Sequence, residues 1–218
     1  MSISDAHRRI DFSTWPRRRH FDILGRGNYP YIGLTVRLDV TRLVLACREA
    51  DENFFTAMLH SSVHAMNSIE NFRYRVVDGE VLLYDVTHPS FTVFHPEDEL
   101  FYFANVEYTD DYAVFKRNAV REMENAVRTR NLDGNHPNAI FVSCLPWLDY
   151  VDMVQPLGLS PNDSVPRLFW GRYVEGVDGR LSLSFSITGH HGLFDGIHVA
   201  RLVEALAELI DRPLFPGT

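Results

Sequence analysis

The chain has 218 residues, of which 45% are hydrophobic and 23% charged, as is typical of globular proteins. Its formal net charge of −8 argues against nucleic-acid binding, which needs clustered Lys and Arg. No apolar stretch has the length of a membrane span or follows Met1 as a signal sequence would. The two cysteines, Cys47 and Cys144, have no metal-ligand or disulfide spacing. We therefore expect a cytoplasmic protein without a membrane or nucleic-acid partner.

The first half of the chain alternates between helical and strand patterns. Apolar residues at helical spacing predict a helix over 39–50, capped by Asp39, and a stronger one over 54–69. Asp78-Gly79 lies between two apolar-rich runs, which is a strong hairpin signal. Residues 90–95 then read as a further strand.

The second half begins with a long charged helical pattern over 110–130. The apolar run that starts at Asn138 predicts a strand ended by Pro146. A second hairpin is expected at Asp178-Gly179, followed by an alternating strand over 181–188. The last apolar stripe predicts a helix that begins near Ile197.

Strands and helices mix without a regular βαβ rhythm, and two hairpins are explicit. This pattern predicts an α+β fold with a mixed, largely antiparallel sheet layered with helices. The absence of repeats and of Pro/Gly/Ser-rich linkers favours a single domain over residues 1–218. One face of the strand 181–188 carries only small hydroxyl side chains, at Ser182, Ser184, Ser186 and Thr188. Such a face suits close packing on water, a ligand or another chain, or plain exposure to solvent.

The stretch "GHHGLFDGIHVARL" (189–202) places polar residues where a strand runs into a helix. A metal site would need three or four ligands, and His191 with His198 supplies only two, so no metal is expected. Ser143 does not lie in a G-x-S-x-G elbow, the turn that presents a nucleophilic serine, so the sequence does not favour this role for Ser143. Of the three chemistries considered for this stretch, general acid/base catalysis by a histidine is the one that the residues allow. From these residues alone, Asp195 as a helix cap and His191 as a core histidine stay open.

The motif HHxxxDGxHxxR in this stretch closely resembles the active-site segment of the chloramphenicol acetyltransferase family. Its H-x-x-x-D-G part is shared with dihydrolipoyl acyltransferases and peptide condensation domains. The blocks "FSTWPRRRHF" (12–21), "HPSFTVFH" (88–95), "FVSCLPWL" (141–148) and "WGRY" (170–173) are similar to family blocks in the same order. The resemblance covers about residues 10–210 and implies the family's acyltransferase fold.

The resemblance implies a catalytic set. His191 matches the general base that takes a proton from the acceptor hydroxyl while this oxygen attacks acetyl-CoA directly in a ternary complex. Ser143 matches the hydroxyl that donates to the oxyanion, and Asp195 matches a structural aspartate paired with Arg17. Acetyl-CoA is then a co-substrate, and no tightly bound cofactor is expected.

The resemblance also implies binding residues and an assembly. Coenzyme A would contact Tyr173, Arg172 and Trp147, and the hydroxyl acceptor would contact Phe101, Phe103, Leu24 and Ile32. Family members are homotrimers with the site between subunits, so we expect a homotrimer. Departures at Phe169 and Gln155 leave the acceptor open: chloramphenicol, a related alcohol, another acyl acceptor, or only a ligand or carrier bound without chemistry.

Overall fold

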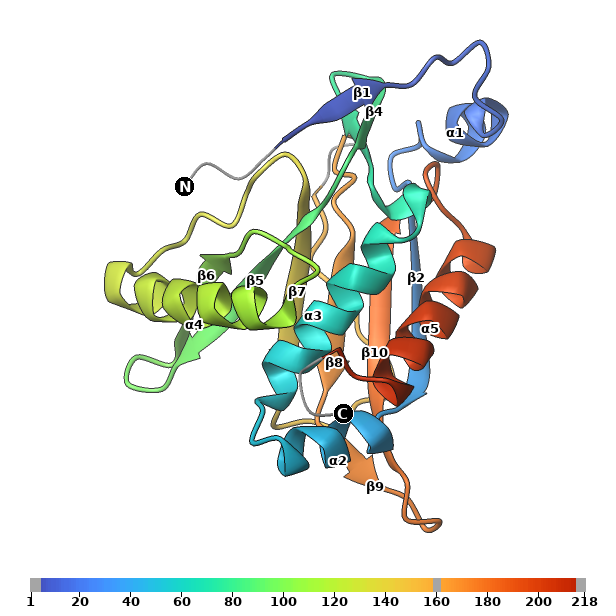
Figure 1. The fold of residues 1–218 in the computed structure, drawn as a ribbon. Helices are drawn as coiled ribbons and strands as arrows, with labels where there is room; N and C mark the ends of the chain where they lie inside the picture. Colours follow the sequence, from blue (N-terminus) through green and yellow to red (C-terminus); the bar gives the residue numbers. More distant parts are fainter. Residues whose placement is uncertain (1–4, 159–161, 215–218) are drawn as a thin grey trace.

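The computed structural model describes residues 5–158 and 162–214, which form a layer of helices on a seven-stranded sheet (Figure 1). The strands follow one another across the sheet as β2 (Tyr31–Asp39), β10 (Leu181–His190), β8 (Arg167–Gly171), β7 (Ala139–Leu145), β5 (His88–His95) and β6 (Leu100–Asn105), with β9 (Val174–Glu175) pairing β10. β7 runs parallel to β5 and β8, and the other pairs are antiparallel. The expected mixed, largely antiparallel sheet is confirmed.

A smaller sheet combines β1 (His7–Arg9), β4 (Glu80–Tyr84) and β3 (Tyr74–Val77). The β3–β4 hairpin turns at Asp78 (φ 50°) and Gly79 (φ 79°), as predicted. Two consecutive positive φ angles fit a two-residue turn of this kind, and Asp-Gly is among the pairs that adopt them at low cost. This sheet lies at the end of the molecule where α1 also lies (Figure 1).

The helices are α1 (Arg18–Leu24), α2 (Thr41–Glu49), α3 (Phe54–Asn67), α4 (Tyr112–Thr129) and α5 (Gly196–Asp211), with a 3₁₀ turn η1 (Glu70–Phe72). The predicted start of α2 was wrong, because Asp39 still pairs with Ser182 in the sheet. Its carboxylate nevertheless accepts the Thr41 backbone N–H at 2.9 Å, just before the helix. Within the described ranges, no helix is long and apolar enough to cross a membrane.

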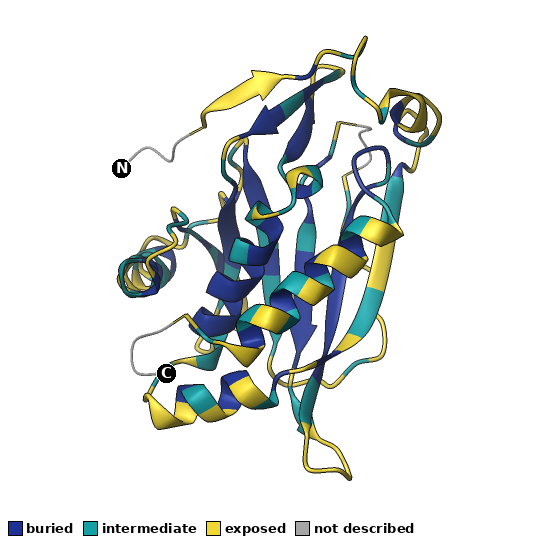
Figure 2. Cartoon of the chain, turned by 45° about the vertical axis from the view of Figure 1, so that its right-hand side comes forward, coloured by how far each residue is buried: buried dark blue, intermediate teal, exposed yellow. Residues whose placement is uncertain are grey.

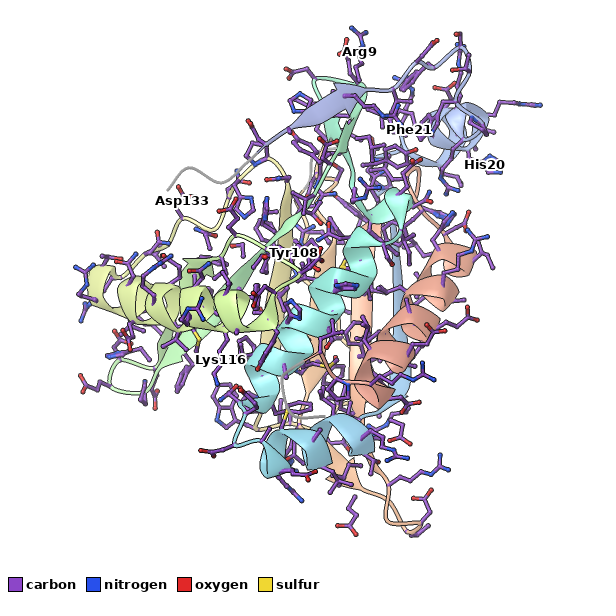
Figure 3. The ribbon with its side chains drawn as sticks, in the orientation of Figure 1. Arg9, His20, Phe21, Tyr108, Lys116 and Asp133 are labelled. Atoms are coloured by element: carbon purple, nitrogen blue, oxygen red, sulfur yellow. The ribbon has the colours of Figure 1, made fainter. Side chains whose placement is uncertain are left out.

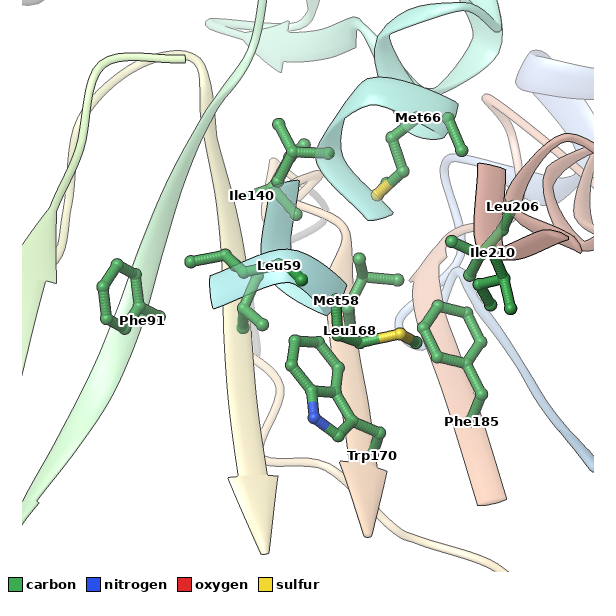
Figure 4. Packing of buried hydrophobic residues seen from close by; sticks show 14 of the residues in the cluster. Met58, Leu59, Met66, Phe91, Ile140, Leu168, Trp170, Phe185, Leu206 and Ile210 are labelled. Atoms are coloured by element: carbon green, nitrogen blue, oxygen red, sulfur yellow. The ribbon is translucent and has the colours of Figure 1, made fainter. Parts of the chain in front are cut away.

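The main hydrophobic core lies between α3, α5 and the sheet (Figure 4). Trp170 and Phe185 stack at 6.5 Å between ring centroids, and both are fully buried together with Met58 of α3. The colouring in Figure 2 shows the same layer, with buried residues where helices meet strands and exposed ones on the outer helix surfaces. β10 is thereby fixed as a central strand, and its end is a rigid place for functional side chains.

The hydroxyl face of β10 is largely covered by the chain's own residues. Ser184 and Ser186 are only 1% and 2% exposed, because the segment 149–157 of the same chain covers them. Ser186 Oγ lies 3.0 Å from the Tyr150 hydroxyl and 2.8 Å from Thr35 Oγ1 of β2. The reading of this strip as a solvated face is therefore wrong at Ser184 and Ser186.

Candidate active site

The turn that joins β10 to α5 is held in place by one arginine. Arg17, just before α1, donates from Nε to the Gly192 carbonyl (2.8 Å) and from Nη2 to the His191 carbonyl (3.0 Å). Its Nη1 makes an ion pair of 2.9 Å with Asp195 Oδ2. A planar guanidinium carries five donors in a rigid fork and so reaches three separated acceptors at once, whereas the three donors of a lysine all lie on one nitrogen. The predicted Arg17–Asp195 pair is confirmed, and Arg17 fixes the main chain at His191 and in the turn that follows it.

The pair is partly exposed, with 12% of the Arg17 side chain and 32% of the Asp195 side chain accessible. Burial alone would raise the pKa of the Asp195 carboxyl, but the hydrogen bond and charge of Arg17 outweigh burial and lower it. Asp195 is therefore ionised at neutral pH and serves as a structural charge.

Asp195 is also the N-cap residue of α5, as the capping alternative suggested. Its backbone N–H donates to His198 Nδ1 at 3.1 Å, so the imidazole satisfies a main-chain donor at the helix start. Burial lowers the pKa of His198, although the Asp195 charge opposes this effect. Asp195 thus both caps the start of α5 and forms the ion pair with Arg17.

His191 is half-buried, and its Nδ1 lies 3.2 Å from the Phe194 carbonyl oxygen. A carbonyl can only accept, so Nδ1 carries a proton, and in the neutral imidazole Nε2 is then the acceptor. The His191 backbone N–H donates to the Pro30 carbonyl at 2.7 Å, which fixes the base of the side chain. An imidazole in one tautomer, with Nε2 unprotonated, is what a general base requires.

The neighbouring His190 has a different environment. It is 0% exposed, stacks on Phe21 at 5.7 Å, and its Nε2 lies 3.1 Å from the Gly25 carbonyl oxygen. Figure 3 shows Phe21 on α1 next to the exposed His20. A Cβ at Gly25 would approach His190 Cε1 to 2.8 Å, so only glycine fits there. His190 therefore packs α1 onto the end of β10.

Ser143 lies in the middle of β7, where Thr92 Oγ1 donates to its Oγ at 3.1 Å. Because Ser143 accepts this bond, its own hydroxyl hydrogen is left to donate to another group. Sequence reasoning missed Thr92, because its place beside Ser143 follows from the register of β5 on β7.

One chain does not bring Ser143 and His191 together. Ser143 is in register with Phe169, which is in register with Ser186. His191 follows Ser186 by five positions, or about 16 Å along the strand direction, and the two strand spacings add about 10 Å sideways. No side chain spans this separation, so the two groups meet only if they come from different chains.

The residues expected at coenzyme A lie on both faces of the sheet. Tyr173 packs edge-to-face on Phe54 at the start of α3, with 5.2 Å between ring centroids. Arg172 is exposed, and its backbone N–H donates to the Leu148 carbonyl at 2.7 Å. Trp147 is 53% exposed, and it lies on the face opposite the helices. Tyr173 and Trp147 therefore lie near the same end of the sheet but on opposite faces.

An aromatic patch occupies the face of β5 and β6 opposite the helices. Phe94 pairs with Phe101 across the strands and contacts Trp147 edge-to-face at 4.9 Å. Phe101 contacts Phe103 at 5.6 Å, and Phe94 and Phe101 are 44% and 51% exposed. We call these four residues the aromatic patch. Two expected acceptor residues, Phe101 and Phe103, therefore lie beside Trp147.

The other two expected acceptor residues lie elsewhere. Leu24 is the last residue of α1 and is partly buried. Ile32 of β2 pairs with Gly189 and packs against the main core. Both lie near the His191 end of β10, far along the sheet from the aromatic patch. Among the residues that the structure describes, no group of three His, Cys, Asp or Glu side chains could hold a metal ion.

The fold of this chain is similar to the folds of two solved acetyltransferases. The fold matches a solved chloramphenicol acetyltransferase with a TM-score of 0.79 and 23% identity, covering 94% of this chain and 98% of that one. A dihydrolipoamide acetyltransferase of Azotobacter vinelandii has a TM-score of 0.66 and 17% identity, covering 85% of this chain and 83% of that one. The fold is thus that of the acetyltransferases in these two structures.

Sequence comparison is more specific. The family model described as chloramphenicol acetyltransferase matches residues 6–207. A chloramphenicol acetyltransferase of Streptomyces acrimycini is 34% identical over 208 residues, covering 94% of each chain. This protein belongs to the chloramphenicol acetyltransferase family.

Proposed function

We propose that this protein transfers an acetyl group from acetyl-CoA to a hydroxyl of a small molecule, with His191 as the general base. The observation that carries the proposal is the environment of His191: Nδ1 is hydrogen-bonded to a carbonyl and the turn is held by Arg17. The family relatives are named for chloramphenicol, which makes it the first acceptor to test. No tightly bound cofactor takes part.

The reaction balances with these groups alone. His191 Nε2 takes the proton of the acceptor hydroxyl while the oxygen attacks the thioester carbonyl carbon. The carbonyl oxygen becomes an oxyanion, and the Ser143 hydroxyl stabilises it, because the bond that Ser143 accepts from Thr92 leaves its hydrogen free to donate. The carbon–sulfur bond then breaks, and the thiolate of coenzyme A leaves with the proton from His191. No acyl-enzyme forms.

The proposed reaction needs two chains, because Ser143 and His191 are far apart in one. We propose a homotrimer in which each interface combines the His191 of one protomer with the Ser143 of its neighbour. The exposed aromatic patch supports this arrangement, since a second chain covering it would remove apolar surface from water. A cyclic trimer repeats one heterologous interface and gives three equivalent sites.

Coenzyme A and the acceptor are proposed to contact different residues of the sheet. We propose that Tyr173, Arg172 and Trp147 contact coenzyme A, where the exposed Arg172 would offset its phosphate charge on this acidic protein. Phe101 and Phe103 are proposed to contact the acceptor beside Ser143, while Leu24 and Ile32 lie at the end of the sheet near His191.

The direct test is release of free thiol from acetyl-CoA, measured with chloramphenicol and a panel of small alcohols. We expect acceptor-dependent release that His191→Ala abolishes. Binding of acetyl-CoA without thiol release for any acceptor would contradict the proposal and favour a non-catalytic ligand-binding or carrier-binding homologue.

A further inference from the structure

Lys116 on α4 (Figure 3) is the only lysine among the 21 lysines and arginines of the chain. Its Nζ lies 2.6 Å from Oε2 of Glu52, a residue of the turn between α2 and α3. The hydroxyl of Tyr112, four residues before Lys116 on α4, donates to the same oxygen at 3.0 Å. Two side chains of α4 therefore contact one carboxylate in the turn that begins α3.

The Glu52 carboxylate is mostly buried, with 15% of its side chain exposed, whereas the Lys116 side chain is 37% exposed. Among the residues that the structure describes, Lys116 is the only cation that pairs with Glu52. A mostly buried carboxylate that loses its cation keeps an uncompensated charge, so it is expected to move towards water. The contact with Lys116 therefore fixes the position of the turn before α3.

The same turn leads into the aromatic ring that packs against Tyr173. The Glu52 backbone N–H donates to the Cys47 carbonyl at 2.8 Å, which joins the turn to the end of α2. Asn53 is the N-cap residue of α3, and Phe54 is the first residue of this helix. Phe54 packs edge-to-face on Tyr173, with 5.2 Å between the ring centroids. A shift of Glu52 would thus move the ring that supports Tyr173.

We propose that Lys116 is a positioning residue for coenzyme A: by holding Glu52 it keeps Phe54, and through Phe54 the ring of Tyr173, in place for the ligand. This inference rests on the proposed acetyl transfer and on the proposed contact between Tyr173 and coenzyme A. The proposed transfer step does not use Lys116. Lys116 therefore acts on the binding of acetyl-CoA and leaves the chemical step unchanged.

Direct attraction between the Lys116 charge and the phosphates of coenzyme A is the competing explanation. The two explanations predict opposite effects of a change at Glu52. If only charge acts, removal of the Lys116 charge weakens binding and removal of the negative Glu52 charge strengthens it. If the ion pair positions the turn, each change weakens binding, because each change breaks the same pair.

The test measures the KM for acetyl-CoA at saturating acceptor. We expect Lys116→Met to raise this KM at least about threefold with little change in kcat, and Glu52→Gln to raise it as well. The double mutant should raise KM by less than the product of the two single effects, and Lys116→Arg, which keeps the ion pair, should retain the native KM. Arg121→Met removes the same charge from an exposed position of α4, and this matched control should leave KM unchanged.

An unchanged KM in Lys116→Met, a lowered KM in Glu52→Gln, or a fall in kcat as large as the rise in KM overturns the inference. Glu52→Gln keeps the size of the side chain and decides alone if Lys116→Met does not fold. Absence of thiol release with every acceptor, chloramphenicol included, contradicts the proposed function instead. In that case calorimetric binding of coenzyme A decides: at least about threefold weaker binding to Lys116→Met supports the positioning role, and equal binding, or none to the native protein, overturns it.

Discussion

The ion pair between Arg17 and Asp195 allows a quantitative test of how the His191 turn is held. The perturbations are Arg17→Met, Asp195→Asn and the double mutant, chosen because each keeps most of the side-chain volume. Arg17→Met removes the ion pair and the bonds to the His191 and Gly192 carbonyls. Asp195→Asn removes the charge but leaves both carbonyl bonds of Arg17 in place.

The expected coupling free energy of the Arg17–Asp195 pair depends on how far the two side chains are exposed to solvent. With Arg17 12% and Asp195 32% exposed, the coupling should lie between the roughly 0–1 kcal/mol of surface pairs and the 3–5 kcal/mol of broken buried pairs, at about 1–2 kcal/mol. Arg17→Met should cost about 3 kcal/mol because two carbonyl acceptors also lose a charged donor. The double mutant should then be about 1–2 kcal/mol more stable than the sum of the single effects predicts.

Urea unfolding at one fixed protein concentration measures these differences, since an oligomer's apparent stability depends on concentration. Arg9 and Glu80 form a matched control pair with 70% and 43% exposure, whose cycle should be additive within about 0.5 kcal/mol. Both Arg17→Met and Asp195→Asn should lower kcat more than they raise KM, because they misplace the base. Additive energies in the Arg17–Asp195 cycle, like those of the control pair, would refute the account of this turn.

Three further outcomes are expected. His191→Ala should lower kcat at least about 100-fold without loss of fold, whereas His190→Ala should mainly lower the unfolding temperature; equal activity losses would mean that the wrong imidazole was chosen. Ser143→Ala should lower kcat about 100- to 1000-fold, and retained activity would remove its oxyanion role. Burial lowers the pKa of His60, so the unfolded chain binds more protons and stability should fall below about pH 6.5. His60→Gln should flatten this dependence by up to about 1.4 kcal/mol per pH unit, and an unaltered slope in urea unfolding would contradict it.

Local patterns predicted those elements whose signal lies within a few residues. The helix at 54–69, the Asp78-Gly79 turn and the alternating strand 181–188 were all confirmed, because periodicity and turn chemistry determine them directly. Helix α1 and strand β8 were not predicted. Their stability depends on distant contacts, such as Phe21 on His190 and Trp170 on Phe185, which a local pattern does not contain.

The candidate site likewise has features that the sequence predicts and features that depend on distant contacts. The motif around His191 and the Arg17–Asp195 pair could be predicted from the family resemblance, and the structure shows the pair. The role of Thr92 beside Ser143 could not be predicted, because it follows from the register of β5 on β7. Register and loop packing are tertiary properties, and they also corrected the reading of the Ser184–Ser186 strip.

The central claim is that each site combines His191 of one chain with Ser143 of another. Co-expression of His191→Ala and Ser143→Ala chains in equal amounts, followed by purification of the mixed oligomers, tests it most directly. Random assembly around one repeated interface pairs an intact His191 with an intact Ser143 at about one quarter of the sites. The account therefore predicts acetyl transfer at about one quarter of the native rate per chain, although each variant alone is nearly inactive. A mixture no more active than its separate components would contradict it.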